Sequence, residues 1–291
     1  MKDQVGGHPM WKHGSNYLLK PLKCDDRGMR EVAFYEMIQE AVNYVCQKNH
    51  SSPSKTYYLN VRVATQGMDR VSHLLRALKP FIPEYFGVVE HHGNLFHRFA
   101  SDSKIVLADI TAMYTQKCVL DLKMGRQTFE PNASIEKKES QRKKYPEQHE
   151  FGFRIVGMRV YDPSHEESDQ CGYRTFDKGF GRRLKKREEV GGALSTFFNV
   201  RGCDPRKEMV GKILDRIKTL RQLLEEYNKE MAFYASSILI AFEGDGRILS
   251  PDMFSIKLID FAHVRYQAGG DPGFNHGLDT IIALIEGLVR E

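Results

Sequence analysis

The stretch Lys117-Cys-Val-Leu-Asp-Leu-Lys-Met-Gly125 lies near the middle of the chain, and the expectations for its surroundings follow from it. Its apolar run predicts a short β-strand that Gly125 ends, with Asp121 and Lys123 on the same face. A carboxylate beside an ammonium at a strand end suits a phosphate-handling site, because the first accepts hydroxyl donors and the second neutralises phosphoryl oxygens. An ion pair on an edge strand would have the same pattern, so the neighbouring motifs decide.

Composition describes a soluble globular protein. The chain has 291 residues, 41% of them hydrophobic and 28% charged, which is enough for one large domain or two lobes. No apolar run is long enough to span a bilayer, and the N-terminus lacks the apolar segment of a signal peptide. The five cysteines are scattered without a C-x-x-C pair, which favours a reducing compartment over a disulfide or zinc framework.

Positive charge is concentrated in two segments. The net charge is +5, and basic residues crowd into 137–144 and 182–187 while acidic residues are spread elsewhere. Such clusters attract nucleic acid, an acidic membrane or a polyanionic small molecule. Charge alone does not choose among these three.

A lysine and a glutamate near the N-terminus form a second candidate pair. A short strand is expected to end at Lys20, and helical spacing over 30–38 places Glu31 in the first turn of a helix. In kinases a strand lysine followed by a helix glutamate orients the lysine on the ATP phosphates. Two solvated surface charges are the alternative.

A basic helix is expected soon after the central stretch. Pro131-Asn132 predicts the stop and N-cap of a helix over about 133–145. Lys137, Gln141 and Lys144 would line one face of it, and it has almost no apolar stripe. Because its like charges repel one another unless they share an anion, we favour an anion-binding face over a solvated one.

The remaining chain alternates strands and helices. Strands are expected at 57–64, 86–90, 105–110 and 152–161 and as a hairpin at 236–242 and 255–261; helices are expected at 71–78, 188–198, 204–231 and 277–288. In the strand at 152–161, Arg154, Val156, Met158 and Val160 should share a face, and 176–184 is interpreted as a turn. His91-His92 is interpreted as an exposed pair, because no carboxylate or cysteine lies nearby to complete a metal site.

Asp260 follows the second strand of the hairpin. A carboxylate on a rigid strand end suits the Mg²⁺ that bridges nucleotide phosphates in phosphoryl transfer. The chain then presents, in order, Lys20, Glu31, the apolar run at 105–110, Asp121 with Lys123, the basic helix and Asp260.

These motifs together resemble the inositol polyphosphate kinase family, whose signature is P-x-x-x-D-x-K-x-G. Ser236-Ser-Ile-Leu resembles the family's S-S-L-L, Asp260-Phe-Ala-His263 its D-F-A-H, and Asp271-Pro-Gly-Phe-Asn-His-Gly-Leu278 its D-x-G-x-x-x-G-L. Segments 129–146, 152–161, 233–237 and 242–244 are most similar to the multikinase branch. The resemblance covers nearly the whole chain.

Three features depart from the family pattern. Lys117 stands where the signature has its first proline, which affects the entry into the strand more than the chemistry. Residues about 46–68 look inserted. The loop between the last two strands is short where some members carry nuclear-targeting sequence, so the resemblance implies the nucleus, the cytoplasm or both.

The resemblance implies an α+β, two-lobed kinase-like fold with antiparallel sheets in both lobes and an ATP cleft between them. The N-terminal lobe would span 1–110 and the C-terminal lobe 111–291, with an inositol-phosphate-binding helical segment at about 130–146. The expected partners are an inositol polyphosphate and, further, phosphoinositide lipid headgroups. No nucleic acid and no transmembrane segment is expected, and the chain should be a monomer.

The resemblance also implies a role for each candidate residue. Lys20, steadied by Glu31, would contact the ATP phosphates, and the backbone of Ala108, Asp109 and Ile110 would form the adenine hinge. Asp121 would bind ribose or substrate hydroxyls, Lys123 would position the acceptor hydroxyl and stabilise charge on the transferring phosphoryl group, Asp260 would bind Mg²⁺, and His263 would lie close to the reacting groups. Lys137, Gln141, Lys144 and Arg159 would hold the substrate phosphates.

The implied activity is transfer of the γ-phosphate of ATP to hydroxyls of inositol tris- and tetrakisphosphates, with phosphatidylinositol bisphosphate as a further acceptor. A hexakisphosphate kinase that makes pyrophosphates is the alternative of the same class, because 120–125 also suits that branch. A non-catalytic binder of polyphosphoinositides or nucleic acid is the alternative of another class. The intact set of Lys20, Asp121, Lys123 and Asp260 argues against lost catalysis.

Overall fold

The computed structural model describes residues 5, 10–43, 65–89, 103–200 and 205–290. The strand expected at 57–64, most of the inserted stretch and the pair His91-His92 lie outside the described residues.

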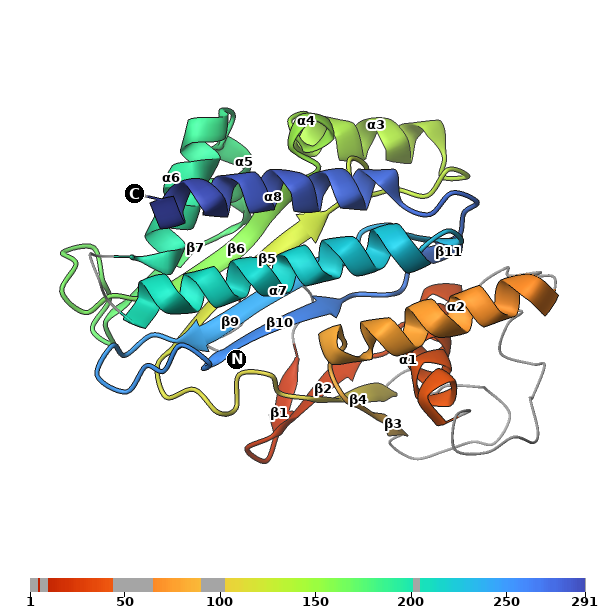
Figure 1. The fold of residues 1–291 in the computed structure, drawn as a ribbon, viewed down its shortest axis with the longest axis horizontal. Coiled ribbons are helices and arrows are strands. Elements are labelled where there is room, and N and C mark those ends of the chain that lie inside the picture. Colours follow the sequence, from red (N-terminus) through yellow and green to blue (C-terminus); the bar gives the residue numbers. More distant parts are fainter. Residues whose placement is uncertain (1–4, 6–9, 44–64, 90–102, 201–204, 291) are drawn as a thin grey trace.

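A four-stranded antiparallel sheet is formed by the N-terminal part of the chain (Figure 1). Its strands are β1 (Trp11–His13), β2 (Tyr17–Pro21), β3 (Tyr85–Val89) and β4 (Lys104–Ala108), in the order β1-β2-β4-β3. Two helices and a 3₁₀ turn accompany it: α1 (Asp26–Asn43), α2 (Thr65–Leu78) and η2 (Lys79–Phe81).

The central stretch forms the middle strand of a second sheet. This five-stranded sheet has the order β10-β9-β5-β6-β7 and is antiparallel throughout. Its strands are β5 (Lys117–Met124), β6 (Phe153–Tyr161), β7 (Tyr173–Phe176), β9 (Ser237–Glu243) and β10 (Phe254–Ile259). A third, two-stranded sheet pairs β8 (Met231–Phe233) with β11 (Val264–Tyr266).

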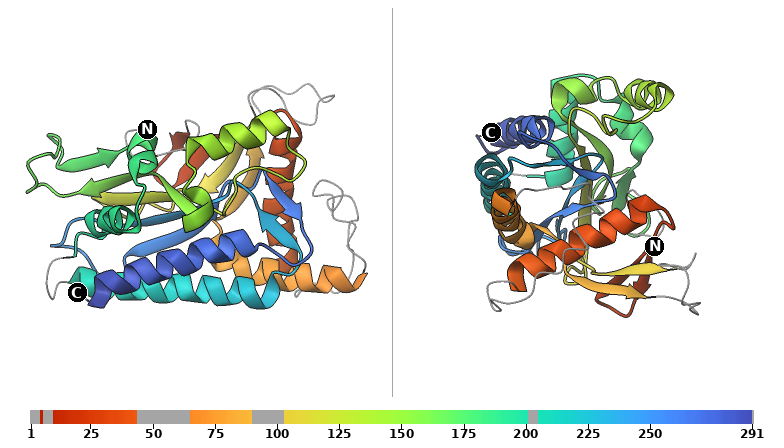
Figure 2. Two further views of the ribbon diagram at one scale, coloured as in Figure 1. Left: turned by 90° about the horizontal axis from the view of Figure 1, so that it is seen from above. Right: turned by 90° about the vertical axis from the view of Figure 1, so that its right-hand side faces the viewer.

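Six helices belong to this second part of the chain. They are α3 (Ile135–Lys144), α4 (Gln148–Phe151), α5 (Lys178–Arg183), α6 (Arg187–Phe198), α7 (Pro205–Tyr227) and α8 (Pro272–Arg290). Figure 2 shows α7 and α8 side by side along one face of the five-stranded sheet, with α3 on the opposite side. This layering leaves one sheet face free of the long helices.

The two faces of β5 have different chemistry. Leu120 and Leu122 are fully buried in the main core, which also includes residues of α7 and α8. The alternate residues Asp121 and Lys123 point to the other face, as the spacing predicts, because successive side chains of a strand alternate. The packing of the leucines therefore fixes the direction in which the candidate catalytic pair points.

A β-bulge in β6 overturns the predicted face of that strand. Asp121 lies opposite Gly157 but Leu122 lies opposite Ile155, so Val156 is an extra residue without a partner on β5. The core then takes Ile155 and Met158, whereas Arg154 lies opposite Lys123. The prediction that Arg154 shares a face with Met158 was wrong, because the bulge shifts the alternation by one residue.

Several predicted element ends also differ. Helix α1 begins at Asp26, so Glu31 lies in its second turn rather than its first. The N-cap of α3 is Ser134 rather than Asn132, and its side chain accepts from the backbone N–H of Lys137. Helix α7 ends at Tyr227, before the predicted 231, because the Asn228 side chain bonds to the backbone of Met231 in a turn. Residues 178–183 form the short helix α5 instead of a turn.

The expected α+β class is confirmed, because helices combine with antiparallel sheets. Within the described parts of the chain, none of the helices combines the length and apolar character that a membrane span requires.

Candidate active site

Lys20 connects the two main sheets. Its Nζ lies 2.6 Å from Glu31 Oε1 on α1 and 2.5 Å from Asp260 Oδ1, just after β10. Burial by itself would lower the pKa of Lys20, but the carboxylates of Asp260 and Glu31 raise it well above its ordinary value. The predicted Lys20–Glu31 pair is therefore present, and it includes Asp260 as a third member.

Asp260 is held in an uncommon backbone conformation. Its φ is +67°, and the Ser236 hydroxyl donates to its carbonyl at 2.8 Å. The adjacent Ala235 also has a positive φ, of +55°, and its carbonyl accepts from Lys123 Nζ at 2.9 Å. Non-glycine residues with positive φ carry a conformational cost and concentrate at functional sites. The Ser236-Ser motif thus positions both Lys123 and Asp260.

Asp121 is a buried carboxylate among charged neighbours. Burial raises its pKa to about 6; the charges of Lys123 and Arg154 lower it, and that of Asp260 raises it further. Within the described residues its Oδ1 has no hydrogen-bond partner. A buried acceptor without a donor is costly unless a ligand supplies the donor.

His263 is oriented by a buried glutamate. Glu130, in the loop before α3, lies 2.5 Å from His263 Nδ1 and 2.6 Å from an Arg265 nitrogen. Burial lowers the pKa of His263 below its ordinary value; the hydrogen bond and charge of Glu130 oppose this, while Lys137 and Arg30 add to it. Sequence reasoning missed Glu130, because a lone carboxylate before a basic helix carries no motif.

Helix α3 lies near both His263 and Arg154. The charge of Lys137, in its first turn, reaches His263, and the charge of Lys144, in its last turn, reaches Arg154. The helix buries none of its residues. Lys137 and Lys144 are thus brought toward the same region as Asp121, Lys123 and Asp260.

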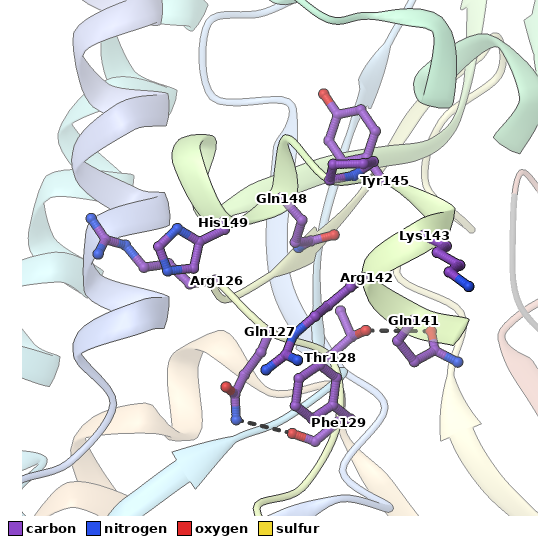
Figure 3. A pocket seen from close by; sticks show the side chains of 11 residues that line it. Arg126, Gln127, Thr128, Phe129, Gln141, Arg142, Lys143, Tyr145, Gln148 and His149 are labelled. Carbon is purple, nitrogen blue, oxygen red and sulfur yellow. Dashed lines mark hydrogen bonds between the residues drawn. The ribbon is translucent and has the colours of Figure 1, made fainter. Parts of the chain in front are cut away.

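The third predicted residue of α3 lies elsewhere. Gln141 lines a hollow of about 510 Å³ between α3, α4 and the loop after β5, where its Oε1 accepts a long, 3.5 Å bond from Thr128 (Figure 3). Arg142, stacked over Phe129, lines the same hollow. Neither Asp121, Lys123 nor Asp260 borders it. Gln148 connects the hollow to the end of β5, since its amide donates to the carbonyls of Lys123 and Gly125.

The expected hinge follows β4. The backbone N–H of Ala108 donates to Glu84 and that of Asp109 to Asn16, so both groups are already bonded within the protein. The buried Asp109 carboxylate accepts from Thr111 and forms an ion pair with Lys12 at 3.1 Å. The carbonyl of Ile110, the third predicted hinge residue, accepts a 3.4 Å hydrogen bond from the Ser255 hydroxyl.

Both arginines of β6 lie opposite residues on the face of β5 that carries Asp121: Arg159 opposite Val119, and Arg154 opposite Lys123. The guanidinium of Arg159 stacks on the Tyr173 ring at 3.6 Å and lies opposite Val119, two residues along β5 from Asp121. The charge of Arg154 reaches Asp121. A bulge cannot be predicted from alternation, so no pattern singles out Arg154.

The residues around Asp260 fit a divalent cation that is bound mainly by phosphates. Within the described residues no group of three or more His, Cys, Asp or Glu side chains forms a metal cage. Two carboxylates are nonetheless close enough to interact, Asp260 and the Asp121 whose Oδ1 lacks a donor. Mg²⁺ is usually held by one or two carboxylates together with substrate phosphates.

Three comparisons place this geometry among known proteins. The family model described as inositol polyphosphate kinase matches residues 104–286. The chain is 31% identical to human inositol polyphosphate multikinase over 246 residues, covering 84% of this chain and 49% of that protein. It is 32% identical to mouse inositol hexakisphosphate kinase 3 over 212 residues, 65% of this chain and 50% of that protein. The chain thus spans about half the length of the curated relatives it matches.

A solved structure has the same fold. The inositol phosphate multikinase Ipk2 of S. cerevisiae, in complex with ADP and Mn²⁺, superposes with a TM-score of 0.67 at 21% identity, covering 94% of this chain and 99% of that one. Because the family model spans well over half of the chain and the sequence motifs lie within one constellation, the chain belongs to the inositol polyphosphate kinase family.

Proposed function

We propose that this protein is an ATP-dependent kinase that phosphorylates hydroxyls of inositol tris- and tetrakisphosphates. The single observation that carries the proposal is the contact of Lys20 with both Glu31 and Asp260. It unites a phosphate-binding lysine, its orienting glutamate and a metal-binding carboxylate, beside the strand that carries Asp121 and Lys123.

The nucleotide side of the site uses residues of both sheets. Lys20 would bind the ATP phosphates, Asp260 would hold Mg²⁺, and Asp121 would accept a ribose or substrate hydroxyl at its unpartnered oxygen. Bound Mg²⁺ neutralises phosphate charge in such a site. We propose residues 108–110 as the adenine hinge. The N–H groups of Ala108 and Asp109 already donate to the carbonyls of Glu84 and Asn16, whereas the N–H of Ile110 takes part in neither bond.

The acceptor side is cationic. Lys123 would position the attacking hydroxyl and stabilise charge on the phosphoryl group, and His263, held by Glu130, would lie beside it. Lys137 and Lys144 would bind substrate phosphates from α3, and Arg154 joins them as a phosphate ligand. Because phosphoryl transfer demands mainly alignment and charge neutralisation, this set is sufficient without a covalent intermediate.

The lobe boundary is part of the same proposal. Residues 1–110 would form the N-terminal lobe and 111–291 the C-terminal lobe. The strands support this, since the four-stranded sheet ends at Ala108 and the five-stranded sheet begins at Lys117. The site would then lie where β2, β5 and the end of β10 meet.

Product identification tests the proposal. The purified protein is incubated with MgATP and, separately, inositol tris-, tetrakis- and hexakisphosphate and phosphatidylinositol bisphosphate in vesicles. We expect the tris- and tetrakisphosphates to gain phosphate. Preferred conversion of the hexakisphosphate would replace this proposal by a pyrophosphate-forming kinase, which the 32% identity to a hexakisphosphate kinase keeps as the second candidate. Binding without turnover of any acceptor would indicate a non-catalytic binder.

The Lys123→Ala variant links turnover to the site. We expect kcat to fall on the order of a hundredfold or more, because a preorganised cation at the developing charge is lost. The fold should survive, since the Lys123 side chain is only partly buried and its one described hydrogen bond is to the Ala235 carbonyl. Near-normal turnover by a folded variant would contradict the assignment.

A further inference from the structure

Three elements bring four cations together around Arg154, the residue opposite Lys123 on the paired strand. The bulge in β6 turns Arg154 toward Lys123, its partner across the strands. Lys144 comes from the last turn of α3, and Lys178 and Arg182 come from α5. Arg182 begins the basic segment 182–187, to which the resemblance assigns no role, and Lys178 is not among the predicted site residues.

Helix α5 packs closely against β6. A Cβ on Gly181 would lie 2.0 Å from the carbonyl oxygen of Ile155, which means that only glycine permits this close approach. The Asp177 side chain caps the helix by accepting from the Phe180 N–H at 2.9 Å. Arg182, which follows Gly181, therefore has a defined position next to the strand that carries Arg154.

The four charges interact with one another. Burial lowers the pKa of Arg154, and the charge of Arg182 lowers it further. Burial likewise lowers the pKa of Lys144, with further contributions from Arg154, Arg182 and Lys178. The charge of Asp121 raises the pKa of Arg154, but burial makes the Asp121 carboxyl itself harder to ionise than an exposed one. Arg182 Nε is buried and, among the described residues, has no hydrogen-bond partner.

We propose that Arg154, Lys144, Lys178 and Arg182 form an additional phosphate subsite for the acceptor, which makes the enzyme favour the more highly phosphorylated inositols. The inference rests on the proposed function. A phosphate dianion would relieve the repulsion within the cluster and supply acceptors for the arginine N–H groups. Directly opposed residues on paired strands lie roughly 5 Å apart at Cβ, so a group aligned by Lys123 has its neighbouring ring substituents within reach of Arg154.

The subsite predicts how affinity changes with the number of phosphates. An acceptor with few phosphates can bind through Lys123 and α3 alone, and it leaves the α5 cations without an anion. An acceptor with more phosphates places one of them among the four cations. Removing a cation of α5 should therefore cost little for the first acceptor and much for the second.

The test compares Arg182→Ala, Lys178→Ala and their combination with Arg183→Ala, a matched control because Arg183 is the exposed neighbour on the same helix. Binding of inositol tris-, tetrakis- and pentakisphosphate is measured by titration calorimetry without nucleotide, and KM and kcat are measured with MgATP. For Arg182→Ala we expect affinity to fall about tenfold for the pentakisphosphate and about twofold or less for the trisphosphate, since hydrogen bonds between charged groups are the strong ones. Arg183→Ala should match the wild type, and all melting temperatures should agree.

The outcomes separate this inference from the proposed function. Equal losses for all three acceptors, or no difference between Arg182→Ala and Arg183→Ala, would overturn the subsite while wild-type turnover leaves the kinase assignment intact. A wild-type protein that neither binds nor phosphorylates any of the three would overturn both. A drop in melting temperature for Arg182→Ala alone would assign the arginine a structural role, and Lys178→Ala, on an exposed side chain, would then decide.

Discussion

Burial makes the ionisation of the Asp121 carboxyl costly. Its pKa in the folded protein is about 6, against an ordinary value of 3.8. Between about pH 4 and 6 the folded state therefore holds a proton that the unfolded state releases, so this group lowers the free energy of unfolding as pH rises through that window. Above pH 6 the cost is fully present.

Replacing Asp121 should reverse that cost. We expect Asp121→Asn to raise the free energy of unfolding at pH 7.5 by on the order of 2 kcal/mol, with a much smaller gain near pH 4, and to abolish kinase activity. Urea unfolding at both pH values and a turnover assay measure the two effects. Asp215→Asn, on the exposed face of α7, is the control and should change neither. A pH-independent effect on stability would contradict the raised pKa.

Glu130 should act on the reaction through His263. Because Glu130 opposes the lowering of the His263 pKa, Glu130→Gln should lower that pKa further and shift the acidic limb of the kcat profile to lower pH. We expect kcat to fall about tenfold with the KM for ATP unchanged, since an oriented base typically contributes a hundredfold or more and an amide keeps part of the contact. The imidazole pKa is measured by NMR. Glu130→Asp, which restores the charge, should recover part of the activity. An unaltered imidazole pKa would show that Glu130 serves only the packing of Arg265.

At the scale of single residues, the sequence predicts pairs that share a strand or a motif. Asp121 and Lys123 share a face by spacing alone, and Asp260 follows an apolar strand whose end is easy to see. Glu130 and Arg154 could not be found, because each acquires its role from a contact with a residue distant in sequence.

Among the helices, α3 is one that we propose binds substrate phosphates. It buries no residue, so removing its cations should not affect the core. We expect the Lys137→Ala, Lys144→Ala double variant to raise the KM for the inositol phosphate by about tenfold at low salt and less at high salt, with little change in melting temperature. Lys143→Ala, on the side of α3 that borders the hollow in Figure 3, is the control. A KM that is insensitive to both the substitution and the salt would make α3 an ordinary surface helix.

The elements that the sequence predicts best are those with a strong apolar period. Helix α7 and the β9–β10 hairpin have continuous buried stripes and were found with errors only at their ends. Sequence patterns do not predict the bulge at Val156 or helix α5, because both depend on tertiary packing. Strand β6 pairs with β5 on one side and β7 on the other, and Gly181 permits α5 to approach β6. Gly179 and Gly181 instead favoured a turn.

At the scale of the whole molecule, the site exists because two sheets meet. Lys20 belongs to the four-stranded sheet and Asp260 to the end of the five-stranded one, and they are 240 residues apart in sequence. Helix α2 also packs against α7, so the main core continues from one part to the other. A contact of this kind depends on how both sheets are packed, and local patterns do not predict that packing. The order of the motifs and the resemblance do predict that these residues share one site.

Asp260 contacts Lys20 through Oδ1 and is the carboxylate we propose for the metal ion, which gives a prediction for the whole molecule. If nucleotide phosphates bind Lys20 while Asp260 binds Mg²⁺, then ADP with Mg²⁺ should stabilise the protein more than ADP alone. At a ligand concentration a hundred times Kd the gain is about 2.7 kcal/mol, which thermal unfolding detects readily. In Asp260→Asn the additional gain from Mg²⁺ should disappear while the part due to ADP remains, because Lys20 and Glu31 are intact. Lys20→Ala should show the opposite pattern and lose the part due to ADP. An equal Mg²⁺-dependent shift in Asp260→Asn and the wild type would move the metal to another carboxylate, and Asp121 would be the residue to replace next.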